Sequence, residues 1–161
     1  MKPELHIGIS GYETTQTLLL RVISLIKEGQ NILFVTSDSS ELVKLRIYDL
    51  MLEDKPSMQE KILLNKREIL IPNKKGYRHI EKTYGKKLKL YQAKGLSLEE
   101  FIQSVTETAA EHQMDVIIID SADNVLNHDG YESRNQWFKA LSEHLENVEG
   151  LRFIFSVHRV E

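Results

Sequence analysis

Residues 114–124, MDVIIIDSADN, constrain the fold of this chain more than any other stretch. Four consecutive apolar residues, three of them isoleucine, lie there between two aspartates. Such an unbroken run is typical of a strand buried on both faces, as in the centre of a parallel sheet. Asp120 and Ser121 follow the run, so a carboxylate is expected at the carboxyl end of that strand, where α/β sheets bind ligands. The alternative is a buried strand whose aspartate only caps a turn.

Strands and helices are expected to alternate along the chain. Strands are predicted at 5–9, 31–36, 87–91, 115–120 and 151–157, and helices at 14–27, 41–52, 97–109 and 132–146. The intervening part is less regular, with a short helix at 59–64, a short strand at 68–71 and a loop or loose helix at 72–85. This alternation predicts an α/β fold with a mainly parallel sheet between helices on both faces.

Parallel strands would bring several polar residues to one edge of that sheet. Each of them follows a predicted strand or begins the next helix: Glu13, Thr14, Thr15, Asp38, Gln92, Asp120, Ser121 and His158. Their convergence follows from the topology alone, and we expect a site there.

Composition narrows the class of protein. At 161 residues, 41% hydrophobic and 28% charged, the chain fits one domain spanning 1–161. It has no cysteine, which excludes disulfides and thiolate metal sites. No apolar run reaches bilayer length and no signal-peptide core is visible, so a cytoplasmic protein without a membrane partner is expected. The histidines show no metal-ligand spacing.

A basic segment spans residues 65–89, with nine lysines and arginines against two glutamates in a chain whose formal net charge is −3. Its cations interleave with Tyr77, His79 and Tyr84, a pattern that suits single-stranded nucleic acid. The residues expected to bind are Lys74, Lys75, Arg78, Lys82, Lys86 and Lys87. A solvated surface loop, or a surface for an acidic protein or a second copy of the chain, is the alternative.

Several segments, taken in order, resemble the RecA-like P-loop ATPases, and within them the motor domain of DnaB-type replicative helicases. FVTSDSSELVKLRIYDLM is similar to their segment of strand, acid and helix, and LKLYQAKGLSLEEFIQSV with MDVIIIDSADNVL to the approach to their Walker B strand. FIFSVHRV resembles their sensor strand. The likeness covers residues 5–159. It implies a three-layer α/β/α P-loop fold, ATP and magnesium as cofactors, and self-association.

The phosphate loop of that family, GxxxxGK[ST], is degenerate in this chain. The corresponding residues are GISGYETTQT, with Gly8, Gly11, Thr14, Thr15 and Thr17 as the nucleotide-binding positions. Either Thr15 or Thr17 would supply the magnesium-binding hydroxyl. In both registers the lysine is missing, because no lysine or arginine lies between Lys2 and Arg21. Glu13 would also repel a triphosphate.

Three further positions are implied by the resemblance as vestigial catalytic residues. Asp38 matches the acid that polarises the attacking water, although it could equally cap the following helix. Asp120 matches the Walker B aspartate, which holds magnesium through water. His158 occupies the sensor position, although a histidine at a strand end is more often a plain turn residue.

These observations argue against an active enzyme. The expected function is a non-hydrolysing interaction or regulatory module in DNA replication, recombination or mobile-element maintenance. Two alternatives are an ATP-binding NTPase completed by a partner or by self-assembly, and a single-stranded nucleic-acid binder acting through the basic segment.

Overall fold

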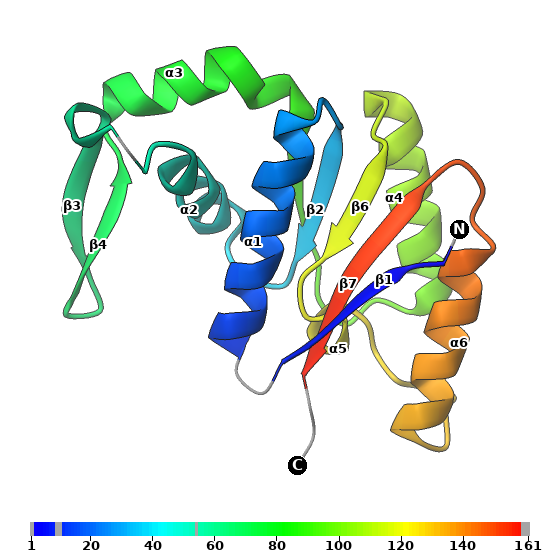
Figure 1. Ribbon diagram of the computed structural model, residues 1–161. Coiled ribbons are helices and arrows are strands. Elements are labelled where there is room, and N and C mark those ends of the chain that lie inside the picture. Colours follow the sequence, from blue (N-terminus) through cyan, green and yellow to red (C-terminus); the bar gives the residue numbers. More distant parts are fainter. Residues whose placement is uncertain (1, 9–10, 54, 159–161) are drawn as a thin grey trace.

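A five-stranded parallel sheet forms the centre of the molecule (Figure 1). The computed structural model describes residues 2–8, 11–53 and 55–158, without the side chains of residues 11–13 and 158. The strands are β1 (Glu4–Gly8), β2 (Ile32–Thr36), β5 (Leu88–Gln92), β6 (Val116–Ile119) and β7 (Arg152–His158), in the order β1-β7-β6-β2-β5. The predicted parallel sheet is therefore confirmed, with β6 as its central strand.

Helices cover both faces of the sheet (Figure 1). One face packs against α1 (Gly11–Lys27), α2 (Ser40–Met51) and α3 (Lys74–Tyr84), and the other against α4 (Leu98–His112), α5 (Ala122–Val125) and α6 (Arg134–Glu146). Alternate residues of each strand supply the two cores. In β6, Val116 and Ile118 join the first core while Ile117 and Ile119 join the second. The unbroken apolar run thus reflects burial on both faces.

Side-chain caps fix where several helices begin. Ser97 and Glu100 form the predicted capping box of α4, with each side chain accepting from the other's backbone N–H. The hydroxyl of Ser39 accepts from the backbone of α2, and that of Ser133 from the backbone of α6. Because Ser39 is the cap of α2, the alternative that Asp38 caps this helix is wrong.

The segment at 59–64 is a strand, so the helix predicted there is wrong. β3 (Gln59–Leu64) follows a short 3₁₀ helix, η1 (Pro56–Met58), and pairs antiparallel with β4 (Arg67–Pro72), which contains the predicted strand at 68–71. Asn65 and Lys66 both have positive φ, 51° and 65°, as two-residue hairpin turns require. The hairpin stands beside α2, apart from the main sheet (Figure 1).

Residues 74–84 form a regular helix, α3, where a loop or loose helix was expected. The side chain of Asn73 caps it by accepting from the N–H of Gly76 at 2.9 Å. A second 3₁₀ turn, η2 (Gly85–Lys87), then leads into the amino end of β5. Within the described ranges, no helix combines the length and the apolar character needed to cross a membrane.

Candidate functional site

Buried polar side chains gather at the edge of the sheet where the parallel strands end. Among the described residues they are Thr14, Thr15, Thr36, Asp120, Ser121 and Ser156. They come from the start of α1, the end of β2, the residues after β6, and β7. Burying a polar group costs free energy unless the group is hydrogen-bonded. The concentration of these six residues at one edge therefore makes that edge the candidate site.

A pair of hydrogen bonds joins the start of α1 to the end of β6. The hydroxyl of Thr15 donates to both carboxylate oxygens of Asp120, at 3.0 Å to Oδ1 and 3.2 Å to Oδ2. Only 2% of Asp120 is exposed, and its own N–H donates to the carbonyl of Val35 at 2.8 Å. Thr17 is exposed. Of the two hydroxyls considered from the sequence, Thr15 is therefore the one that lies against the aspartate.

Two residues at this edge were not singled out from the sequence. The hydroxyl of Ser156 accepts from the N–H of Ser121 at 2.8 Å, and that of Thr36 accepts from the N–H of Asp38 at 3.1 Å. Ser121 is held at a φ of 56°, a left-handed conformation that costs energy outside glycine. The sequence does carry a signal for Ser156, because it is the one polar residue inside the apolar run FIFSV.

Asp38 and Arg46 lie at the rim of a small cavity between α2 and the β3–β4 hairpin. Its volume is about 250 Å³ and its lining is mostly apolar, namely Leu42, Val43, Leu45, Leu64, Ile69 and Ile71, with Asp38, Ser39 and Arg46 as its polar part. The guanidinium of Arg46 donates to the side-chain oxygen of Gln16 in α1 at 3.4 Å. Arg46 therefore brings a positive charge to the residue that follows Thr15.

The remaining predicted positions are only partly placed. Gly8 ends β1 opposite His158 of β7, and Gly11 begins α1. The side chains of Glu13 and His158 lie outside the described part of the chain. Gln92 is exposed at the end of β5 and accepts from the N–H of Ser40 at 3.3 Å.

The basic segment exposes most of its charged side chains, whereas its aromatic rings are partly buried. Lys74, Lys75, Arg78, Lys82 and Lys86 are exposed, whereas Lys87 donates to the carbonyl of Gly29 at 3.5 Å. The side chains of Tyr77 and Tyr84 pack against the core beneath α1 and α2.

The ring of Tyr77 lies 5.2 Å from that of Tyr48, centroid to centroid, and His79 contacts Lys55. Stacking of bases on these aromatic residues stays a prediction, because both tyrosines are only partly buried.

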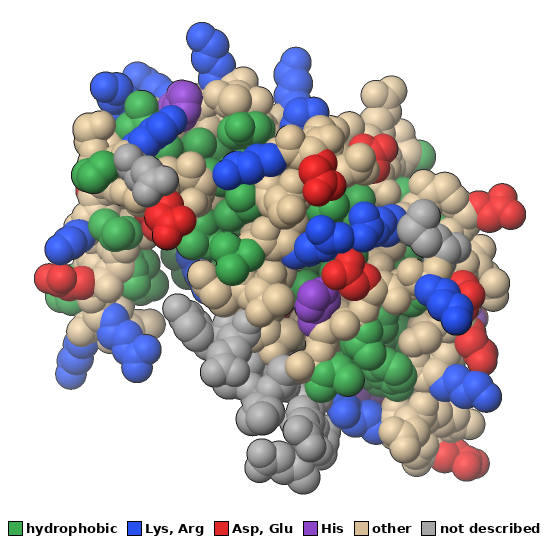
Figure 2. All heavy atoms as spheres, in the orientation of Figure 1, with side chains coloured by type: hydrophobic (Ala, Val, Ile, Leu, Met, Phe, Trp, Pro, Cys, Tyr) green, Lys and Arg blue, Asp and Glu red, His purple; other side chains and the backbone are tan. Residues whose placement is uncertain are grey.

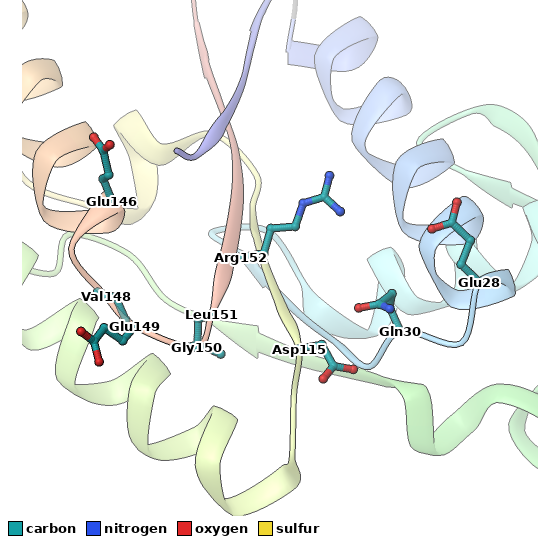
Figure 3. A pocket seen from close by; sticks show the side chains of 9 residues that line it. All are labelled: Glu28, Gln30, Asp115, Glu146, Val148, Glu149, Gly150, Leu151 and Arg152. Atoms are coloured by element: carbon teal, nitrogen blue, oxygen red, sulfur yellow. The ribbon is translucent and has the colours of Figure 1, made fainter. Parts of the chain in front are cut away.

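Another hollow lies at the opposite, amino edge of the sheet (Figure 3). It has a volume of about 610 Å³ and is lined by Glu28, Gln30, Asp115, Glu146, Val148, Glu149, Gly150, Leu151 and Arg152. Figure 3 shows its carboxylates spread around the hollow, with Glu28 just after the end of α1 and Glu146 at the end of α6. Within the described ranges, no three His, Cys, Asp or Glu side chains lie close enough to hold a metal ion.

Comparison of the sequence with models of known protein families found no match, and comparison with curated proteins found none either.

Proposed function

We propose that this chain is a degenerate RecA-like domain, similar to the motor domain of DnaB-type helicases, that does not hydrolyse nucleotide. In this proposal it acts as an interaction or regulatory module in DNA replication, recombination or mobile-element maintenance. The proposed role in DNA replication, recombination or mobile-element maintenance is supported by the sequence resemblance alone. The proposed loss of hydrolysis is also supported by the geometry at the carboxyl edge of the sheet.

The hydrogen-bonded pair of Thr15 and Asp120 is the observation that carries the proposal. The resemblance aligns these two residues with the hydroxyl and the carboxylate that hold magnesium in P-loop ATPases. Their oxygen atoms fit that ion, which prefers oxygen ligands and keeps several waters, so two protein groups suffice. With nucleotide and magnesium bound, the metal would supply charge neutralisation at the phosphates.

Residues 11–14, which correspond to the phosphate-binding half of the family's loop, do not fit a phosphate group. In the register that puts Thr15 at the hydroxyl position, residues 11–14 correspond to the second half of the phosphate loop. Here α1 already begins at Gly11, so these residues lie in its first turn and cannot wrap around a phosphate. Thr14 stands where the lysine would be, and it is buried. Phosphoryl transfer depends on positioning and charge stabilisation, and both are weakened here.

A second candidate, nucleotide binding without turnover, is favoured by Arg46. Its guanidinium reaches Gln16 from α2 and so lies one residue from Thr15 along α1. Arginine suits phosphate recognition, because its planar fork can make two parallel hydrogen bonds. The dipole at the amino end of α1 would add a weaker attraction for an anion.

One set of assays separates these two candidates. We expect no magnesium-dependent release of phosphate from ATP above the level of Asp120→Ala. Turnover by the wild-type chain that Asp120→Ala abolishes would refute the proposal. A thermal shift with ATP and magnesium that shrinks in Arg46→Gln, but not in the exposed control Lys139→Gln, would support binding without turnover.

The interaction role needs its own measurement. Sedimentation velocity of the chain, alone and mixed with a DnaB-type helicase, should show a faster complex in one of the two samples. Two species that sediment unchanged in the mixture, together with a monomer at all concentrations, would count against an interaction module.

A further inference from the structure

The outward side of α3 carries a basic face, which we define as Lys74, Lys75, Arg78 and Lys82. All four side chains are exposed, and within the described part of the chain none of them forms an ion pair. Figure 2 shows Lys and Arg side chains along the upper rim of the molecule, where Figure 1 draws α3. Positive charge is therefore concentrated on one helix of a chain with a formal net charge of −3.

Close packing on its inner side fixes the orientation of α3. Gly76 and Ile80 are buried there, and a methyl group at Gly76 would lie 2.2 Å from the carbonyl oxygen of Met58. The capping side chain of Asn73 also donates to the carbonyl of Ser57 at 2.8 Å. The basic face is thus held in place, which limits the entropy lost when it binds a partner.

The one acidic residue of α3 does not neutralise this face. Glu81 accepts the hydroxyl hydrogen bond of Tyr48, and its carboxylate lies 3.4 Å from the ammonium of Lys44. Both partners belong to α2. The carboxylate is therefore engaged on the side of α3 that faces α2, while the cations point to solvent.

The chemistry of the basic face fits a phosphate backbone better than a protein. Protein interfaces are built around aromatic and apolar anchors and are poor in lysine. None of the large apolar side chains exposed in the described ranges lies on α3, and those nearest in sequence, Leu63, Leu64 and Leu70, belong to the hairpin. Tyr77 and Tyr84 are partly buried against the core, which limits the ring surface that is open to unpaired bases.

We propose that the basic face binds the backbone of double-helical DNA without reading its sequence. Lys74, Arg78 and Lys82 are spaced by four residues, so they form a row about 12 Å long on one side of the helix. Each DNA strand carries one phosphate per ~3.4 Å of axis, so a row of this length spans about four phosphates. The inference is independent of the proposed nucleotide site, because α3 leads into the amino ends of the strands and Thr15 lies at their carboxyl ends.

Fluorescence anisotropy with a short duplex of random sequence, titrated at two salt concentrations, tests the proposal. Four phosphate contacts predict affinity roughly 150-fold weaker in 200 mM than in 50 mM salt. Single-stranded DNA of the same length should bind no more tightly than the duplex. Failure to bind duplex at 50 mM salt, affinity that ignores salt, or a clear preference for single strands would overturn the inference.

Two matched triple variants locate the binding surface. One replaces Lys74, Arg78 and Lys82 by glutamine, and the other replaces the exposed Lys27, Lys94 and Lys139, so the two change the net charge equally. The plot of log affinity against log salt concentration has an expected slope of magnitude about 3.6 for the wild-type chain. The variant of the basic face should lower this slope to about 0.9, and the control variant should leave it unchanged. Equal losses in both variants would contradict a local face. Lys82→Gln alone, expected to lower the slope by about 0.9, provides a milder substitution.

Discussion

At the scale of single residues, the contact between Thr15 and Asp120 decides how the carboxyl edge of the sheet is interpreted. The sequence pointed to both residues, because each stands at the end of a predicted strand or the beginning of the next helix. It could not choose between Thr15 and Thr17, since either spacing resembles a degenerate phosphate loop. The choice depends on how α1 is rotated about its axis, which is set by packing with residues more than 100 positions away.

Replacing Thr15 by valine should destabilise the protein by about 2 kcal/mol, because a buried carboxylate loses a hydrogen-bond donor. Urea denaturation of the variant and the wild-type chain measures this difference. Ser24→Ala, an exposed position in the same helix, is the control and should change the free energy of unfolding by less than about 0.5 kcal/mol. Equal effects at both positions would mean that the hydrogen bond to Asp120 contributes nothing.

At the scale of elements, local patterns predicted the five strands of the sheet, the long helices and the strand at 68–71. They gave the wrong element at 59–64 and left 72–85 between a loop and a loose helix. QEKILL has no clean alternation of apolar and polar residues, so its strand could not be told from a helix. A signal was present in the two residues Asn65 and Lys66 between two apolar runs, although asparagine followed by lysine is a weaker turn signature than asparagine followed by glycine. α3 was ambiguous because only Gly76 and Ile80 are buried in it.

The attachment of α3 gives a prediction at this scale. Alanine normally stabilises a helix relative to glycine, but Gly76→Ala should destabilise the protein by about 1–3 kcal/mol, because its methyl group would meet backbone at Met58 and the side chain of Leu52. Denaturation in urea measures the effect. Gly85→Ala should cost less, since its methyl group meets only the side chain of Glu81 and no backbone atom. A neutral Gly76→Ala would show that α3 is free to move away from η1.

At the scale of the whole molecule, alternation of strands and helices was enough to predict a parallel sheet with helices on both faces. The order of the strands was not predicted, because it depends on pairing between distant segments. β1 lies at an edge, so Leu5 and Ile7 are exposed although they alternate as strand residues should. The face that each helix covers follows from the same long-range pairing.

Two side chains that contact α3, those of Tyr48 and Lys44, make the stability of the protein depend on pH in the alkaline range. Burial, and next the carboxylate of Glu81, raise the pKa of Tyr48 above its ordinary value of 10.0. Burial opposes protonation of Lys44, but Tyr77 and Glu81 outweigh it, so the pKa of Lys44 lies above 10.5. Both groups therefore stay protonated up to a higher pH in the folded state than in the unfolded state. Their contribution is present below pH 10 and is lost as the pH rises above it.

The free energy of unfolding should therefore fall between about pH 9 and about pH 11, and fall less steeply in Tyr48→Phe. At neutral pH the same variant should be less stable by about 1–3 kcal/mol, because Glu81 loses a donor. Urea denaturation across this pH range checks both effects. Identical slopes in the variant and the wild-type chain would exclude Tyr48 as a source of alkaline sensitivity.

The pairing of β1 with β7 also governs when the protein can fold during its synthesis. Glu4 and Arg152, whose side chains lie 3.3 Å apart, are separated by 148 residues of chain. Among the described strands, β7 alone pairs with β1. At the usual speed of a ribosome, β1 waits roughly 7 to 30 s for that neighbour to be made. During that time its apolar residues Leu5 and Ile7 belong to an unpaired segment that chaperones can hold.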